Sequence, residues 1–329
     1  MYKKEKPISF FKGSTSALCN NLSVHINADR GIITYAVVHK SVVNFISTSI
    51  DGSTANHRQI VCKEPSAAQG SSMVFQAKLI PMPNRTILVI TSQKGIQMFE
   101  ADGSIMLYWY AVGDVNSQEI EACFARGICG VQSDTICVGN HEGHILVFDI
   151  PGRGTNITVA EILKGHKSAI CDIASEHDKV VSSDELGDII LWQAGDTFQQ
   201  ISRIGGTPGV PCTSLKIWDD LIVAGYLTGH LRMFSASTGR ISAEVTAHAR
   251  CITAIDVAPK SGMILTVGED SFVHIWAIKR RSPVNEIEHK YSESVTDLQL
   301  QGAQFLNQEG RSFCATGYDS NELHFFTEN

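Results

Sequence analysis

The sequence predicts an all-β protein: a single seven-bladed β-propeller of four-stranded antiparallel blades, with the last blade closed by an N-terminal strand. Three observations support this prediction. Aromatic residues recur at Phe148, Trp192, Phe234 and Trp276, at spacings of 44, 42 and 42 residues. Each ends a short apolar phrase, and self-similarity at this period is typical of repeat architectures. Between these phrases lie runs rich in Val, Ile and Thr, broken by Gly, Asp, Asn and Ser, with no persuasive helical stretch.

One repeat unit illustrates the blade. We expect Ala169–Ala174 to form its inner strand, Lys179–Ser183 the second, Asp188–Trp192 the third and Phe198–Arg203 the outer one. Each run is short and apolar, and turn-forming residues separate it from the next. Four antiparallel strands per unit make one propeller blade.

The whole chain, residues 1–329, divides into units of this kind. The expected blades cover residues 18–62, 72–111, 118–165, 166–205, 211–246, 247–290 and 291–326, the last completed by residues 6–12. The inner strands of the third and last blades are expected at Glu121–Ala125 and Val295–Leu300. Six blades with a degenerate insertion remain an alternative.

The last unit is one strand short. We expect Pro7–Lys12 to pair beside Glu322–Phe326 and to close the ring, because an unpaired edge strand is a template for aggregation.

Composition limits the partners. Hydrophobic residues make up 43% of the chain and charged residues 19%, and the net charge of −7 includes no block of like charge. This composition is typical of a globular protein and gives no electrostatic basis for binding nucleic acid. No apolar run approaches the roughly 18 residues of a membrane helix, so no stable membrane insertion is expected. With no apolar region after Met1 to suggest a secretory signal, we expect a cytoplasmic protein, with nuclear or peripheral membrane association left open.

The nine cysteines are dispersed and include no Cys-x-x-Cys pair. We interpret them as reduced thiols that act as small core residues. No cofactor is expected.

Several of these phrases resemble the WD40-repeat family. The pair Gly165-His166 matches its Gly-His element, and Ala247-His248 is a weaker version. Trp192 and Trp276 occupy the tryptophan position, with Asp270 at the turn aspartate. Ser182 and Thr266, each ten residues before a tryptophan, match the strand hydroxyl. In the Trp192 blade, Leu186 replaces the expected aspartate.

The resemblance implies a hydrogen-bonded set inside the blade. Its members here are His248, Thr266, Asp270 and Trp276, and His166, Ser182 and Trp192 in the preceding blade. Buried polar networks are favourable only when every member is satisfied. We therefore interpret both sets as structural and not as nucleophile triads, because the tryptophan ring occupies the space beside the hydroxyl.

The function predicted is a non-enzymatic scaffold or adaptor whose rim binds other proteins, with self-association as a weaker option. Propeller loops on one rim are where recognition residues belong. The candidate rim residues are Lys167, Leu186, Tyr226, Arg250, Tyr318 and Asp319.

The alternative is a propeller-fold enzyme with a metal in the central channel. It requires acidic or histidine side chains on inner strands that point to the axis. The candidates are His25, Glu121, Asp172, Asp256 and Asp297.

Overall fold

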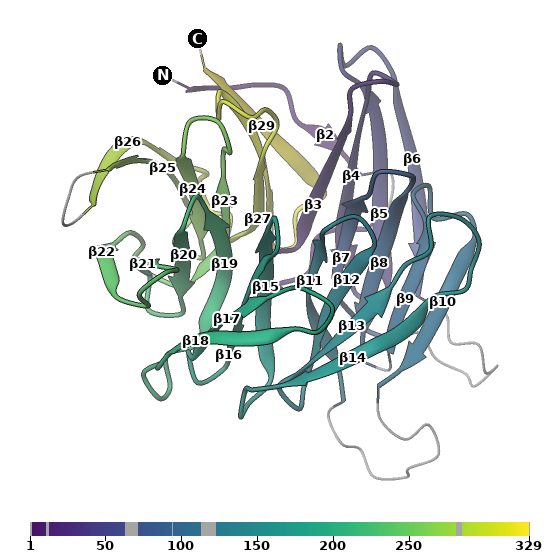
Figure 1. Cartoon of the computed structure of the whole chain (residues 1–329). Coiled ribbons are helices and arrows are strands. Elements are labelled where there is room, and N and C mark those ends of the chain that lie inside the picture. The colour runs from purple at the N-terminus through teal and green to yellow at the C-terminus, as the bar shows by residue number, and fades with distance from the viewer. Residues whose placement is uncertain are drawn as a thin grey trace.

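A computed structural model describes residues 2–10, 13–62, 72–93, 95–112, 123–280 and 285–328. In these ranges the chain forms seven antiparallel sheets and no helix. The sheets follow one another around a ring (Figure 1). The prediction of an all-β, seven-bladed propeller is thereby confirmed, against the alternative of six blades.

The blades follow the chain in order, and in six of the seven described sheets all four strands are consecutive. The first three blades contain β3 (Leu22–Asn27), β4 (Ile32–His39), β5 (Val42–Ser49) and β6 (Ala55–Val61); β7 (Val74–Pro81), β8 (Thr86–Ser92), β9 (Gly95–Glu100) and β10 (Met106–Ala111); and β11 (Ala125–Val131), β12 (Thr135–Asn140), β13 (His144–Asp149) and β14 (Thr158–Lys164). The next three contain β15 (Ile170–Glu176), β16 (Lys179–Asp184), β17 (Ile189–Gln193) and β18 (Gln199–Ile204); β19 (Cys212–Trp218), β20 (Leu221–Tyr226), β21 (His230–Ser235) and β22 (Ile241–Thr246); and β23 (Ile252–Val257), β24 (Met263–Gly268), β25 (Phe272–Lys279) and β26 (Glu286–Ser294).

The seventh blade combines both ends of the chain. Its strands are β27 (Leu300–Phe305), β28 (Ser312–Gly317), β29 (Glu322–Glu328) and β1 (Tyr2–Lys4), and the two-residue β2 (Ile8–Ser9) also pairs with β29. The N and C labels accordingly lie close together in Figure 1.

Closure by an N-terminal strand is confirmed, but the strand itself differs from the expected Pro7–Lys12. The longer pairing is Tyr2–Lys4 against Phe326–Glu328, whereas Ile8–Ser9, within the expected segment, pairs with Glu322–Leu323 as expected. Pro7 has no N–H to donate to a ladder, so it interrupts the pairing. Phe11 and Lys12 lie outside the described residues.

Two inner strands also lie later in the chain than expected. The third blade uses β11 instead of Glu121–Ala125, and the last uses β27 instead of Val295–Leu300. Glycines explain both differences. A Cβ at Gly130 would lie 2.4 Å from the Ile80 side chain of the preceding blade, and one at Gly302 would lie 2.7 Å from Leu22. These glycines permit close approach between blades and do not mark turns.

The outer strand β26 runs to Ser294, four residues beyond the expected end of the sixth blade. The seven antiparallel sheets otherwise follow the order of the expected units.

The hydrophobic core lies between adjacent blades. Ile80 and Ile87 of the second blade pack with Ile128 and Phe148 of the third. The recurring aromatics occupy the same place in each junction: Phe148, Trp192, Phe234 and Trp276 are all buried. Burying one large apolar side chain contributes about 1.5–3 kcal/mol, so a blade is stabilised mainly by its neighbours.

Polar side chains join the inner strands around the ring. At six junctions a side chain of one inner strand accepts a hydrogen bond from a backbone N–H of a neighbouring one. The pairs, donor first, are Leu79 to Ser23 (3.1 Å), Gly127 to Gln76 (3.0 Å), Leu215 to Asp172 (2.8 Å), Ile255 to Ser214 (3.0 Å), Phe305 to Asp256 (2.8 Å) and Val24 to Gln304 (2.8 Å).

A candidate binding face at one end of the ring

Two sets of loops lie on the same side of the propeller. They connect the second strand of each blade to the third, and the fourth strand to the next blade. Backbone hydrogen bonds join them within successive blades, as from His141 N to Phe124 O (3.0 Å), Glu185 N to Ala169 O (3.1 Å), and Tyr318 N to Gln299 O (2.7 Å). We call the surface formed by these loops the loop face.

Glycine allows the loops to pack this closely. At Gly229, with φ of 81°, a Cβ would lie 2.0 Å from the carbonyl oxygen of His248 in the neighbouring loop. A side chain is therefore excluded by both the backbone conformation and the space.

A buried polar network supports the loop face in the fourth blade. The Nε2 atom of His166 lies 2.7 Å from Ser182 Oγ, which accepts a hydrogen bond from Trp192 Nε1 at 2.9 Å. Asp184 Oδ2 lies 2.9 Å from His166 Nδ1. The side chains of His166 and Asp184 have no exposed surface.

Asp184 is a residue that the sequence interpretation missed. The sequence pattern places Leu186 at the position of the network aspartate, whereas in the structure the aspartate is two residues earlier, at the end of β16. Its Oδ1 accepts hydrogen bonds from the backbone N–H groups of Leu186 and Asp188, both at 3.0 Å. The alternating pattern of β16 was the available signal, since Ser182 and Asp184 share one face of the strand.

The sixth blade contains a second network. His248 Nε2 lies 2.9 Å from Thr266 Oγ1, and Trp276 Nε1 donates to the same oxygen at 3.0 Å. Asp270 Oδ1 lies 2.9 Å from His248 Nδ1, and Oδ2 accepts from Ala249 N at 2.8 Å. Although burial opposes it, the hydrogen bond with His248 holds the pKa of Asp270 below its ordinary value.

These hydrogen bonds define what the networks can do. Both hydroxyls are fully buried and already contact a histidine and a tryptophan. The aspartates use their second oxygens to hold backbone N–H groups of the loops. The arrangement therefore fixes the shape of the loop face and leaves neither hydroxyl accessible to a substrate.

Five of the six candidate rim residues lie exposed on the loop face. Leu186 is 39% exposed and Tyr318 is 48% exposed. Lys167, Arg250 and Asp319 are also exposed, and Asp319 accepts a hydrogen bond from Ser14 Oγ at 3.1 Å.

Tyr226 is the exception, and its assignment to the exposed rim was wrong. It ends β20 and is only 3% exposed, because its ring packs between blades and under the guanidinium of Arg232, 4.7 Å from the ring centroid. Burial raises the pKa of its hydroxyl. The exposed residue in this loop is its neighbour Leu227, at 47%.

Other exposed apolar residues on the loop face were not predicted. Met73 precedes β7 and Phe272 begins β25, and each is 38% exposed. The half-buried Phe75 of β7 and Phe124, which precedes β11, stack at a centroid distance of 4.9 Å. Each lies at a strand end, where a sequence pattern does not distinguish a core position from a surface one.

The central channel does not bring the expected acidic residues together as ligands. Asp172 and Asp256 each bind a backbone N–H of the next blade, and Asp256 also pairs with Lys216 at 3.1 Å. Burial raises the pKa of Asp172. Lys78 donates to Ile128 O at 2.7 Å, and the remaining cavity is about 80 Å³.

The other metal-ligand candidates are dispersed. His25 lies near Thr86, Asp297 lies in an exposed turn, and Glu121 is outside the described residues. In the part of the chain that the structure describes, no group of three or more His, Cys, Asp or Glu side chains could hold a metal ion. Among the same residues, no helix is long and apolar enough to span a membrane.

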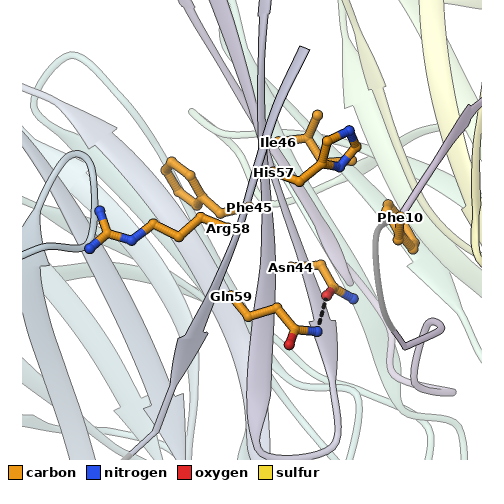
Figure 2. Close-up of a pocket in the computed structure, with 7 residues that line it drawn as sticks. All are labelled: Phe10, Asn44, Phe45, Ile46, His57, Arg58 and Gln59. Atoms are coloured by element: carbon orange, nitrogen blue, oxygen red, sulfur yellow. Dashed lines mark hydrogen bonds between the residues drawn. The ribbon is translucent and has the colours of Figure 1, made fainter.

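A small cavity of about 170 Å³ lies beside the first blade. Figure 2 shows Phe10 of the closing segment on one side, opposite residues of β5 and β6. Gln59 donates a hydrogen bond to Asn44 Oδ1 at 2.8 Å. The cavity separates the closing segment from the outer half of the first blade.

The blades, their buried networks and the loop face together define a WD40-type β-propeller. Solved structures agree in fold. A chain of the "Crystal Structure of Mitotic Checkpoint Complex" aligns with a TM-score of 0.74 at 16% identity, over 99% of this chain and 91% of that one. "Structure of U3-55K" aligns with a TM-score of 0.73 at 14% identity, over 99% and 98% of the two chains.

Comparison with protein families and relatives identifies the chain more narrowly than its fold class does. A family model described as WDR54 matches residues 1–328. WD repeat-containing protein 54 of Homo sapiens is 40% identical over 336 residues, which cover 99% of each chain. The Mus musculus protein of that name, and WD repeat domain 54 of Rattus norvegicus, are 40% identical over 332 residues and 98% of each chain. The chain therefore belongs to the WDR54 family.

Proposed function

We propose that this propeller is a non-enzymatic adaptor that binds a segment of a partner protein on its loop face. One observation supports the proposal most directly: five large apolar side chains are exposed on this face. They are Met73, Leu186, Leu227, Phe272 and Tyr318.

Charged residues lie among these apolar side chains. Lys167 and Arg250 contribute positive charge, and Asp319 contributes negative charge. Apolar and aromatic anchors surrounded by polar groups are typical of protein interfaces, where Tyr and Arg are enriched at energetically important positions. A partner segment that carries both charged residues and apolar anchor residues fits this surface better than a uniformly charged polymer.

The rigidity of the face also favours recognition. The buried networks of the fourth and sixth blades hold the backbones of the loops that contain Leu186 and Arg250. A preformed surface loses little conformational entropy on binding. The solved neighbour in the mitotic checkpoint complex comes from an assembly of proteins, which is consistent with an adaptor role.

The test compares partners captured by matched variants. Leu227→Asp and Tyr318→Ala change the loop face, whereas Ile50→Asp changes an exposed residue (55%) at the opposite end of the ring. Quantitative mass spectrometry of captured proteins should show one set that both loop-face variants lose and the Ile50 variant keeps. If all three variants retain every partner, the loop face is not the binding surface.

The enzyme alternative has its own measurement. Elemental analysis of the purified protein should find no stoichiometric metal. A tightly bound metal at one equivalent, lost on Asp172→Ala substitution, would contradict the adaptor proposal.

Self-association is a separate and weaker expectation. It is favoured by Ile201 and Ile241, which are exposed on outer strands (53% and 55%). Light scattering that shows only monomer would remove this expectation.

A further inference from the structure

The N-terminal segment that closes the ring is held at both ends by aromatic residues. We call residues 2–10 the closing segment, which runs beside β29 (Figure 1). At one end Tyr2 packs on Tyr291 and Phe313. At the other end Phe10 is buried in a hydrophobic cluster of the first and seventh blades. Between these two anchors, the hold of the closing segment depends on its pairing with β29.

This pairing is short and interrupted. β1 and β2 form ladders of three and two residues with β29, and the chain between them forms no ladder. On β29, Leu323 pairs with Ile8, and Phe325 O accepts a hydrogen bond from Glu5 N at 2.8 Å. His324 lies between Leu323 and Phe325 in the chain, so it occupies the gap between the two ladders.

His324 is buried at this gap without a hydrogen bond. The residue is 5% exposed, and among the described residues neither ring nitrogen has a hydrogen-bond partner. The carboxylate of Glu322 comes within 3.9 Å of Nδ1, which is too far for a hydrogen bond. Buried polar side chains are hydrogen-bonded in the large majority of cases, so His324 is an exception.

The surroundings of His324 favour its neutral form. Lys4 of β1 lies on the same face of the sheet as His324. Burial and, to a smaller extent, the Lys4 ammonium lower the pKa of His324, whereas Glu322 acts in the opposite direction from a position 41% exposed to water. β2 contains no charged residue, and the partner of His324 on β28 is Ala315. At neutral pH the imidazole therefore carries no charge.

We propose that His324 makes the closure of the ring sensitive to acid: protonation of its imidazole releases residues 3–9 of the closing segment from β29. An imidazolium has two N–H donors, and here both would be buried without an acceptor. Burial of an unpaired charge costs far more free energy than burial of a neutral ring. β28 is held between β27 and β29, whereas the closing segment has only its two short ladders. The imidazolium therefore reaches water by displacing the closing segment.

Release of the closing segment uncovers the outer edge of β29. The N–H and C=O groups along this edge then lack partners, as at any open strand edge. The seventh blade keeps β27, β28 and β29 in this state. The inference does not depend on what the loop face binds, because it concerns only the closing segment.

Hydrogen exchange followed by mass spectrometry tests the proposal. The purified protein is labelled at pH 7.5 and at pH 5.5, and each rate is corrected for the intrinsic effect of pH on amide exchange. Protection of residues 3–9 should fall several-fold at pH 5.5. The upper limit is about tenfold, because an exposed imidazole with the ordinary pKa of 6.5 is about tenfold more protonated than neutral at this pH. Peptides from β18, an outer strand of the fourth blade, should show no such fall.

Three variants assign the effect to His324. His324→Leu cannot be protonated, so its closing segment should keep the same protection at both pH values. Lys4→Gln removes the positive charge beside the imidazole and should show a smaller fall than the wild type. Lys3→Gln is the matched control, because Lys3 is exposed on the opposite face of the same strand and its loss should leave the wild-type fall unchanged.

Two wild-type results would overturn the proposal: equal protection of residues 3–9 at the two pH values, or an equal fall in β18. An acid-induced fall of the same size in His324→Leu and the wild type would also contradict it, since another group would then be responsible. If His324→Leu does not fold, the wild-type labelling and the comparison of Lys4→Gln with Lys3→Gln still decide the question.

Discussion

The hydroxyls of Ser182 and Thr266 each lie between a histidine and a tryptophan, in the fourth and sixth blades. The spacing of Ser/Thr before Trp was enough to predict both groups, because the strand register fixes which residues face the tryptophan. The aspartate of each network was harder to predict. Asp270 lies in the turn six residues before its tryptophan, whereas Asp184 still belongs to its strand, so a fixed spacing finds only the first.

Thr266→Val should lower the free energy of unfolding by about 1–3 kcal/mol. The substitution keeps the shape but leaves the buried Trp276 N–H and one nitrogen of His248 without a partner. Urea unfolding measures the change. The matched substitution Thr155→Val, at an exposed position, should have little effect, and equal losses in both variants would argue against the network.

His274 should make the stability of the sixth blade depend on pH. Burial, with the nearby His248 and His289, lowers its pKa from 6.5 to about 4. As the pH falls below 6.5 the unfolded chain takes up the proton first, so stability is lost between pH 6.5 and about 4. Between pH 7.5 and pH 5, the free energy of unfolding of the His274→Gln variant should fall by about 1 kcal/mol less than that of the wild type, after allowance for solvent screening.

Urea unfolding at these two pH values measures the difference. The Thr155→Val variant should follow the wild type, since it changes no titratable group. If His274→Gln and the wild type lose the same stability between the two pH values, His274 is not the group responsible.

At the scale of the element, the inner strands were the hardest to place. They contact neighbours on both sides and contain glycines where two backbones approach, so β11 and β27 resemble turns in the sequence. The third strands were easier, because their apolar runs end in a buried aromatic residue. Whether a residue at a strand end is exposed, like Leu227, or buried, like Tyr226, depends on the packing between blades. That packing leaves no pattern in the sequence of a single repeat.

Gly130→Ala tests the close approach between the second and third blades. The added Cβ would lie 2.4 Å from Ile80 Cγ2, so the interface must shift, and we expect a loss of about 1–3 kcal/mol. Gly205→Ala is the control, since no atom lies within 4 Å of its Cβ position. Thermal unfolding distinguishes them, and a Gly130 variant as stable as the Gly205 variant would show that the interface adapts freely.

For the whole molecule, the number of blades and the manner of closure followed from counting strands. The count left one blade a strand short and one N-terminal segment without a blade. Counting strands does not show which residue of that N-terminal segment packs in the core. Tyr2 is 8% exposed and packs on Tyr291 and Phe313, with centroid distances of 5.0 and 5.2 Å.

Tyr2→Ala should therefore weaken the whole ring. Loss of a large buried ring costs about 3–5 kcal/mol in a core, and the lower end is expected for a strand at the edge of its sheet. Lys4→Ala, in the same strand but exposed, should be nearly neutral. Chemical denaturation with size-exclusion chromatography would report both stability and association. Equal stability of the two variants would mean that β1 does not close the ring.

The pairing of β1 with β29 also has a consequence for synthesis on the ribosome. Of all the described strands, β1 emerges first, whereas its partner emerges last. Throughout translation of the intervening blades, β1 has no native partner, and blades that have already formed end in an open edge. Closure therefore becomes the final step of assembly, and protection of the nascent chain by chaperones is needed most until that step is complete.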